Sequence, residues 1–313
     1  MTTFTRLTIR PASLNKLFKK SLILLLPIVC VACHKADPPV TVLPVELWYA
    51  QQPLTCETPN IQQDITWSIG QFAFFMSQLQ IQDKQHLRPL KLQVNDWQTS
   101  ELALLQFFSR ECQSQVDSPL HNSKPANASH SGSQHNDDQH SDVQHTDIQH
   151  SDVQQTVSLR LHQQLELAEP LLVNEHSELT FELGVPFALN HLNPLTQPSP
   201  LNLPAMFWSW RAGYKFLRLD LFNANESWVF HLGSTGCVAD SVMRSPKMAC
   251  AEPNRLQFSL KPQRDGTALL VHLDRLLAGV KLEGRQSCLL QPEQQSCQIL
   301  LNNLANGQVF EWR

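Results

Sequence analysis

The sequence predicts an all-β domain, a β-sandwich or barrel-like fold with Greek-key-type connections, few short helices and stabilising disulfides. Three observations lead to this. Short runs of alternating apolar and polar residues recur along the 313 residues. The chain has 20 prolines and almost no long amphipathic helical pattern. Six cysteines remain once an export signal is set aside. Many short strands separated by turn residues are typical of sandwiches and barrels.

The first predicted strands are VELWYA, at 45–50, and DITWSIGQFAFFMSQLQIQD, at 64–83, in which Phe72, Phe74 and Met76 alternate onto one face. The run ELALLQFFSREC, at 101–112, fits either a short helix or a buried strand, because periodicity does not separate them at this length. Further strands are predicted at 157–167, 177–185, 215–222, 227–233, 255–260, 267–273 and 308–313. One or two helical turns are expected between Asp274 and Gly279.

Residues 1–32 form a predicted signal peptide. Five basic residues precede an apolar run from Leu22 to Ala32, and no acidic residue stands before it. The run is too short to cross a bilayer, so we expect it to be removed on export. The chain has 24 basic and 28 acidic residues, so loss of those five would leave 19 against 28, a net charge near −9. Nothing in this balance suggests nucleic acid as a partner.

The signal ends in Cys30-Val31-Ala32-Cys33, which resembles a bacterial lipoprotein cleavage site. This predicts lipidation of Cys33, with an ordinary export signal cut nearby as the alternative. Residues 33–44 would then be a Pro-rich tether between the lipid anchor and a folded domain at 45–313. The expected location is the periplasm, or the outer membrane through the anchor, in a Gram-negative type of cell.

Residues 113–155 contain a His-rich stretch with a five-residue repeat, QHSDV, QHTDI, QHSDV. Such a composition buries too little apolar surface to offset chain ordering, so we expect a disordered insertion in the domain. It carries six histidines beside several aspartates. Weak, multivalent metal capture and a polar loop without a role are both open interpretations.

The cysteines of an exported chain are interpreted first as disulfides, since their number here is even. Sequence proximity suggests three pairs, although six cysteines allow fifteen pairings. A structural zinc site would need Cys-x-x-Cys spacing, which the chain lacks after its signal. The suggested pairs are Cys56 with Cys112, Cys237 with Cys250, and Cys288 with Cys297.

The stretch from Leu183 to Cys237 carries the side chains with metal or redox chemistry. These are His191, the pair Trp208 and Trp210, and His231. Imidazole is a good ligand for copper, zinc or iron. Each histidine alone is more often a hydrogen-bonded structural residue, and such a tryptophan pair is more often part of the core. Residues alone therefore predict an exported β protein with a candidate metal site.

The segments GVPFALNH, SPLNLPAMFWSWRAGYKFLRLDL and HLGSTGC, followed by Cys250 and AEPNR, resemble the MbnP family of periplasmic copper-binding proteins. In that family a di-haem partner related to cytochrome c peroxidases, MbnH, oxidises a tryptophan of the Trp-x-Trp motif to kynurenine, and the modified protein binds copper. The resemblance implies that Trp208 or Trp210 is the oxidised position, with Trp208 favoured. It also implies that His191 and His231 are flanking copper ligands.

The chemistry behind this implication is simple. The indole nitrogen only donates a hydrogen bond and has no lone pair for a metal, whereas kynurenine exposes an aryl amine and a ketone. The chain lacks a nucleophile elbow, a paired acid and base, or a cofactor loop, so we expect no enzyme activity of its own. The alternative is a structural or surface lipoprotein without a functional metal site.

Overall fold

The computed structural model describes residues 40–83, 86–108, 112, 161–263, 266–289 and 294–313. They belong to one compact unit, Pro38–Arg313. The signal at 1–32, the lipidation site Cys33 and the insertion at 113–155 lie outside the described residues. Strands dominate, and the predicted all-β fold is confirmed. Within the described residues, no helix combines the length and apolarity needed to cross a membrane.

The larger sheet is organised around one 18-residue strand, β4 (Thr66–Asp83). The order β12-β11-β4-β8-β13 runs through it, and β3, β5 and β6 also pair with β4. The strand pairs with β11 over its first half and with β8 over its second half. The other strands of this sheet are β3 (Asn60–Gln62), β5 (His86–Pro89), β6 (Leu102–Phe108), β8 (Glu178–Leu183), β11 (Leu217–Phe222), β12 (Ser227–Leu232) and β13 (Leu256–Leu260).

The segment for which helix and strand were both open forms the strand β6, and all seven of its residues are buried. Its neighbours explain this outcome. β6 pairs with β4 along one side, while Gln106 bridges to His162. A strand covered on both faces has no polar side to show, so its sequence lacks the alternation that identifies half-buried strands.

The smaller sheet has the order β15-β14-β1-β2, and β7 also pairs with β1. Its strands are β1 (Val40–Tyr49), β2 (Gln52–Pro53), β7 (Gln164–Leu171), β14 (Leu269–His272) and β15 (Phe310–Trp312). The tether prediction is wrong for Val40–Pro44, because these residues form the first half of β1. Leu43 is fully buried opposite Leu165, so this segment gains both pairing and burial.

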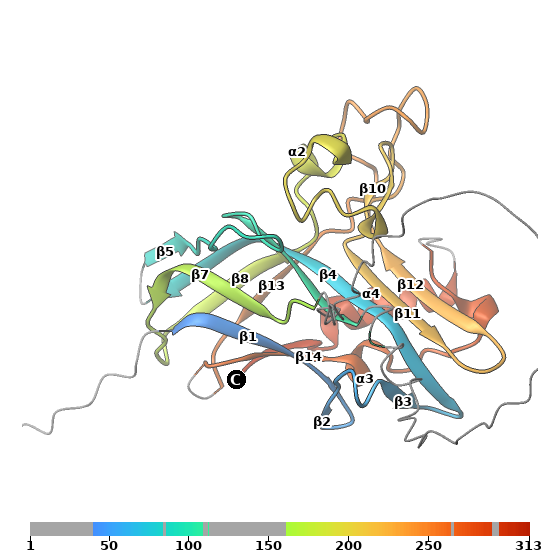
Figure 1. Cartoon of the computed structure of the whole chain (residues 1–313), viewed down its shortest axis with the longest axis horizontal. Helices are drawn as coiled ribbons and strands as arrows, with labels where there is room; N and C mark the ends of the chain where they lie inside the picture. Colours follow the sequence, from blue (N-terminus) through green and yellow to red (C-terminus); the bar gives the residue numbers. More distant parts are fainter. Residues whose placement is uncertain (1–39, 84–85, 109–111, 113–160, 264–265, 290–293) are drawn as a thin grey trace, which may run out of the picture. The chain divides into compact units, whose positions relative to one another are not determined.

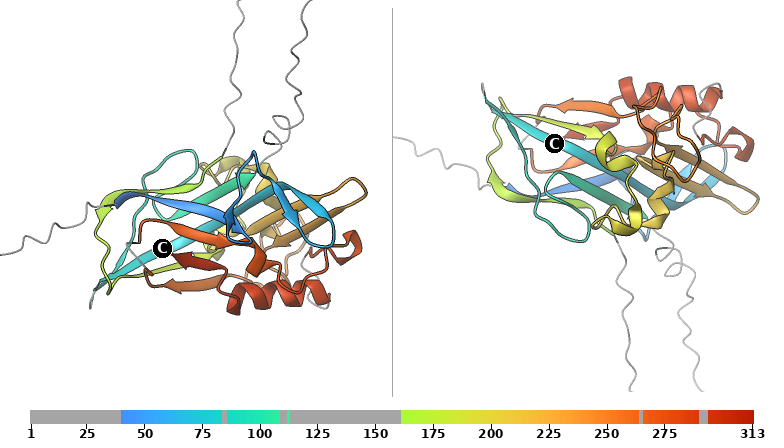
Figure 2. Two further views of the ribbon diagram at one scale, coloured as in Figure 1. Left: turned by 90° about the horizontal axis from the view of Figure 1, so that it is seen from below. Right: turned by 90° about the horizontal axis from the view of Figure 1, so that it is seen from above.

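The two sheets pack face to face through aromatic side chains. Phe310 of β15 contacts Phe74 of β4, Phe181 of β8 and Phe258 of β13, with ring centroids 4.6–5.7 Å apart. Figure 2 shows the domain from opposite sides, with β1 and β14 in front in the view from below. A single hydrophobic core therefore joins the sheets.

Three short α-helices lie wholly within the part of the chain that the structure describes, and all are outside the sheets: α2 (Phe187–Asn190), α3 (Leu273–Leu276) and α4 (Gln295–Asn306). The predicted helical turn after β14 is α3. The helix α4 was not predicted from the sequence. Its segment, QSCQILLNNLAN, is mostly polar, and only a narrow stripe that includes Cys297, Leu300 and Leu304 is buried. Single-turn 3-10 helices are η1 (Pro194–Thr196), η2 (Pro204–Met206) and η3 (Gly284–Gln286).

The three disulfides join the pairs that sequence proximity suggested. Cys288–Cys297 links α4 to the edge of the larger sheet. Cys288 bridges in parallel to Phe230 of β12, and its carbonyl accepts the backbone N–H of His231 at 2.9 Å. This disulfide therefore braces the strand that carries one of the candidate ligands.

Two long excursions leave the larger sheet at neighbouring strand ends, and we call them together the loop lobe, residues 184–216 and 233–255. The first runs from β8 to β11 and the second from β12 to β13. Leu217 pairs with Leu232, and Leu183 pairs with Leu256, so each excursion departs beside a returning strand. Figure 1 shows α2, β10 and the second excursion standing together beyond the sheet. The topology thus gathers distant sequence segments in one place.

Candidate metal centre

The Trp-x-Trp motif lies on a small hairpin of the loop lobe, β9 (Phe207–Ser209) and β10 (Gly213–Tyr214). Trp208 is the middle residue of β9, and Trp210 follows the strand; both are half-buried. Gly213 has φ +78°, and a Cβ there would lie 2.4 Å from the side chain of Asn190. Only glycine suits this turn, because it combines a left-handed conformation with close packing.

The indole of Trp208 lies between an imidazole and an ammonium group. Its ring centroid is 6.2 Å from that of His231, and Lys215 Nζ lies 5.5 Å from the ring. On a third side, a Cβ on Gly233 would come within 2.8 Å of Trp208 Cζ3. Gly233 therefore serves to make room for the indole and not to supply an unusual backbone angle.

His231 is held in a defined orientation by a carboxylate. It lies in β12, opposite Arg218 of β11. His231 Nε2 is 2.7 Å from Asp220 Oδ1, and Asp220 Oδ2 accepts hydrogen bonds from Arg218 Nε at 2.9 Å and Nη2 at 2.5 Å. His231 Nδ1 is buried and has no hydrogen-bond partner among the described residues. With Nε2–H donating to Asp220, a neutral His231 leaves its Nδ1 lone pair free.

Burial and neighbouring groups shift the pKa values of two charged side chains near Trp208, Asp220 and Lys215. Burial raises the pKa of the Asp220 carboxyl, but hydrogen bonds from His231 and Arg218 outweigh it and leave the pKa below its ordinary value. Lys215 is 8% exposed. Desolvation, aided by Arg218, lowers the pKa of Lys215 to about 8. The Asp220 carboxylate is thus charged at neutral pH and can fix the His231 tautomer.

His191 follows α2 as its C-cap residue and is 4% exposed. Its Nδ1 is 3.0 Å from the Trp210 carbonyl oxygen, to which the ring N–H donates. Its Nε2 is 3.1 Å from Asn190 Nδ2 and 3.7 Å from Cys250 Sγ. Desolvation lowers the pKa of His191, although the bond to the Trp210 carbonyl opposes this. The ring is therefore neutral at pH 7, with its lone pair on Nε2.

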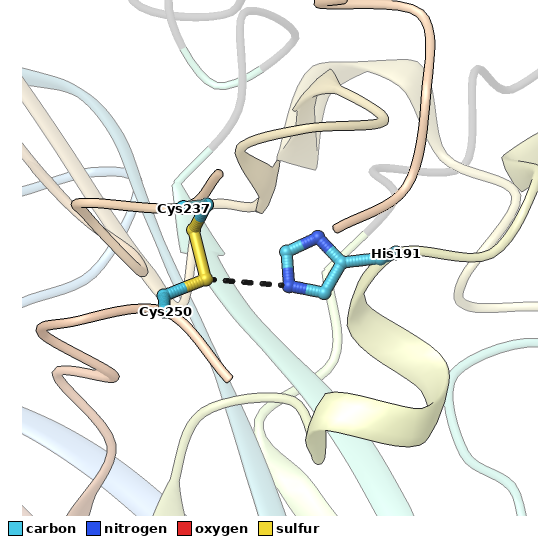
Figure 3. Close-up of side chains that lie close together, drawn as sticks. All are labelled: His191, Cys237 and Cys250. Atoms are coloured by element: carbon cyan, nitrogen blue, oxygen red, sulfur yellow. Dashed lines mark hydrogen bonds between the residues drawn. A yellow bond between two sulfur atoms is a disulfide. The ribbon is translucent and has the colours of Figure 1, made fainter. Parts of the chain in front are cut away.

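His191, Cys237 and Cys250 form a group that could hold a metal ion. One ligand atom from each lies within 4.8 Å of the others. Figure 3 shows the imidazole from the first excursion facing the sulfurs from the second. Cys237 and Cys250 are joined as a disulfide, and only a thiolate is a metal ligand, so the disulfide form offers His191 alone.

Comparison with known proteins identifies the family. The sequence matches the MbnP family over residues 39–297. This chain belongs to the MbnP family. Among solved structures it is similar to MbnP from Methylosinus trichosporium, with a TM-score of 0.60 and 18% identity, covering 84% of this chain and 86% of that one. At that identity the likeness is one of fold. A search of curated proteins found no match.

In this MbnP-family chain the four metal and tryptophan candidates, His191, Trp208, Trp210 and His231, belong to the loop lobe or the adjoining end of β12. The structure brings Trp208 beside His231 and joins Trp210 to His191 through its carbonyl. His191 is the C-cap residue of the one-turn helix α2, and His231 lies inside the strand β12. Each imidazole thus contacts one tryptophan of the motif: His231 through the indole ring of Trp208, and His191 through the backbone carbonyl of Trp210.

Sequence reasoning missed Asp220, Arg218 and Lys215 as members of the site. A signal was present, because Arg218 and Asp220 alternate with the buried leucines of β11 and so share one face. The sequence does not reveal the register between β11 and β12, which puts Arg218 opposite His231. Asn190 was missed as well; its Oδ1 accepts from Tyr214 N at 2.8 Å and its Nδ2 lies 3.5 Å from Ser234 Oγ.

Proposed function

We propose that this MbnP-family chain is an exported, non-catalytic copper-binding protein, in which a tryptophan of the Trp-x-Trp motif is oxidised to kynurenine by a di-haem partner of the MbnH type. His191 and His231 would hold copper together with the modified residue. The observation that carries the proposal is the buried, unpartnered Nδ1 of His231 beside the indole of Trp208. Such a nitrogen is costly unless something binds it.

The two histidines fit copper in the same way. Metal-binding histidines donate their other ring N–H to a carboxylate or backbone carbonyl, which fixes the tautomer and raises basicity. His231 does so to Asp220, and His191 does so to the Trp210 carbonyl. The atoms left to bind copper are then Nδ1 of His231, which has no partner among the described residues, and Nε2 of His191, which would give up its contact with Asn190 Nδ2. Imidazole nitrogens suit copper, and copper bound there would be the cargo or the resident ion.

Trp208 is the better candidate for oxidation, with Trp210 as the other. The Trp208 ring lies against His231, whereas Trp210 contacts His191 through its backbone carbonyl. The partner oxidase would add two oxygen atoms across the indole C2–C3 bond of Trp208, and hydrolysis would then release the C2 carbon as formate, so the residue gains one oxygen atom and loses one carbon atom in total. This reaction would replace an indole that cannot bind a metal by an aryl amine and a ketone near a free imidazole nitrogen.

The loop lobe also has features that suit a docking partner. Both tryptophans are half-buried and not deep in the core. Leu195, Val238, Met243 and Met248, all in the same lobe, have exposed fractions of 61–87%. These exposed apolar side chains are available to a protein that docks on the loop lobe. The proposed partner is the di-haem oxidase, and the proposed location is the periplasmic space, with Cys33 as the lipid anchor.

The test compares the chain expressed with and without a di-haem oxidase of this type. We expect a mass change equal to one added oxygen and one lost carbon only with the oxidase, located at Trp208 by fragmentation and abolished by Trp208→Phe. The amount of copper bound to the purified protein should be higher when the tryptophan has been oxidised. An unmodified mass and no copper under both conditions would support the structural lipoprotein instead.

A matched histidine pair tests the ligand assignment. His272 pairs with Glu311 at 3.0 Å in the smaller sheet, and its side chain is 11% exposed, against 12% for His231. We expect His231→Asn to lower copper affinity by about tenfold or more, as for a lost ligand, and His272→Asn to leave it unchanged. Equal copper affinity in the two variants would remove His231 from the site.

A further inference from the structure

We infer that His191, Cys237 and Cys250 form a redox-gated copper site, which binds Cu(I) when the Cys237–Cys250 disulfide is reduced. It is an alternative to the proposed site with His231, because both sites use Nε2 of His191. The site needs neither tryptophan oxidation nor a di-haem partner, so it goes beyond the proposed function. Figure 3 shows the juxtaposition on which it rests, an imidazole nitrogen 3.7 Å from Cys250 Sγ in a buried part of the loop lobe.

The three ligand atoms already have the separations that one ion requires. Two sulfurs bound to one tetrahedral ion at about 2.3 Å lie about 3.8 Å apart. The three atoms here all lie within 4.8 Å of one another, so opening the disulfide requires only small side-chain movements. Two thiolates and one imidazole are soft to intermediate donors and select Cu(I) over hard cations.

The imidazole is oriented for this role before any metal arrives. The Nδ1–H of His191 donates to the Trp210 carbonyl, which leaves the Nε2 lone pair on the side of the sulfurs. Asn190 Nδ2 is the present partner of that lone pair, at 3.1 Å. The amide of Asn190 also contacts Ser234, so it keeps a partner when Nε2 turns to a metal.

The loop between the cysteines is held in place by contacts other than the disulfide. Thr235 and Glu252 exchange two backbone hydrogen bonds of 2.9 and 3.1 Å just outside the two cysteines. Within the loop, Ser245 Oγ donates to the His191 carbonyl at 2.5 Å. Arg211 N donates to the carbonyl of Val242 at 3.2 Å. These bonds keep both thiols near His191 after reduction, which is what a preformed site requires.

The redox step is a thiol–disulfide exchange. A dithiol protein gives two electrons and two protons to the Cys237–Cys250 bond, and its own two thiols become a disulfide. Each cysteine thiol of this chain then loses its proton as Cu(I) binds. Oxidation of the pair reverses the step and removes two of the three ligands. Copper would therefore be held or released according to the redox poise around the protein.

The experiment measures Cu(I) affinity and stoichiometry of the exported chain, by competition with a colorimetric Cu(I) chelator, before and after reduction with a phosphine under anaerobic conditions. We expect reduction to add one tight Cu(I) equivalent, accompanied by ultraviolet thiolate-to-copper absorption. The double variant Cys237→Ser/Cys250→Ser should lack this increment. Copper held by the other histidines and cysteines is common to both proteins and cancels in the comparison.

Two further variants test the ligands, and His231→Asn is the one that separates this site from the proposed kynurenine site, because His191 belongs to both. His191→Ala should weaken the reduction-dependent Cu(I) by about tenfold or more, while His231→Asn should leave it unchanged. Near-ultraviolet circular dichroism confirms that each variant keeps its tertiary packing. A reduction-dependent equivalent that persists in the double serine variant, or that ignores His191→Ala, would overturn the inference. Either outcome leaves the test of tryptophan oxidation untouched.

Discussion

Replacing Asp220 by Asn tests whether the carboxylate, and not merely the shape of the side chain, prepares His231 for copper. Asp220 accepts from His231 at 2.7 Å and from Arg218 at 2.9 and 2.5 Å, and its side chain is 23% exposed. An asparagine fits the same space. It can turn its NH₂ group toward His231 Nε2, however, and the ring proton would then move to Nδ1, the nitrogen that copper needs.

The magnitude follows from these contacts. Hydrogen bonds to charged groups contribute about 1.5–3 kcal/mol each, and partial exposure moves the loss toward the lower end, so we expect Asp220→Asn to lose about 2 kcal/mol of unfolding free energy. Loss of an outer partner of a metal-binding histidine weakens metal affinity by about 10- to 100-fold. Urea unfolding measures the first quantity, and competition with a Cu(I) chelator on the oxidase-treated protein measures the second.

The chain offers a closely matched control in Glu311. This carboxylate also bridges a histidine and an arginine, with His272 Nε2 at 3.0 Å and Arg275 Nη2 at 3.6 Å, and it is 15% exposed. Glu311→Gln should cost similar stability without changing copper affinity. Unchanged copper affinity in a folded Asp220→Asn protein, or an equal loss in Glu311→Gln, would refute the role assigned to Asp220.

Three other substitutions probe the surroundings of the site and the core. Lys215 has a folded-state pKa lowered to about 8, so between pH 8 and pH 10.5 the unfolded chain binds more protons than the folded one. The stability of the wild type relative to Lys215→Met should therefore rise with pH through this window, by up to about 3 kcal/mol, in urea unfolding at a series of pH values. Gly233→Ala would place a Cβ 2.8 Å from the Trp208 ring and 2.7 Å from a backbone carbonyl, so we expect a loss of about 1–3 kcal/mol and a shifted tryptophan emission spectrum. An unchanged spectrum would show that the indole does not need that space. Phe310→Ala removes the ring that joins three strands of the larger sheet to the smaller one, and it should cost about 3–5 kcal/mol in the same unfolding assay.

Most of the strands could be predicted because the alternation of apolar and polar residues is contained within each strand segment. The segments at 177–185, 215–222 and 227–233 alternate because one face of each strand is buried, and they form β8, β11 and β12. The segment at 64–83, which forms β4, alternates in burial only toward its ends, because residues 69–77 are buried on both faces. Where a segment lacks this alternation altogether, prediction failed or stayed open. β6 is buried on both faces, and α4 buries only a narrow stripe beneath polar residues.

The boundary of the folded domain was also beyond local reasoning. Val40–Pro44 looks like the end of a Pro-rich tether, yet it pairs with β7 in the smaller sheet. Backbone pairing between segments more than 120 residues apart leaves no mark in either segment by itself. A tether and an edge strand have similar compositions, and only the partner strand distinguishes them.

By itself, the sequence determined the residue types of the candidate site, the disulfide pairs suggested by the order of the cysteines along the chain, and membership of a family through long motifs. Only the tertiary structure decided which atoms meet. Strand register placed Arg218 opposite His231 and thereby brought Asp220 to its ring, and the two excursions of the loop lobe set His191 against Cys250. Imidazole tautomers are fixed by such partners, so which nitrogen is free to bind a metal depends on contacts between residues far apart in the chain.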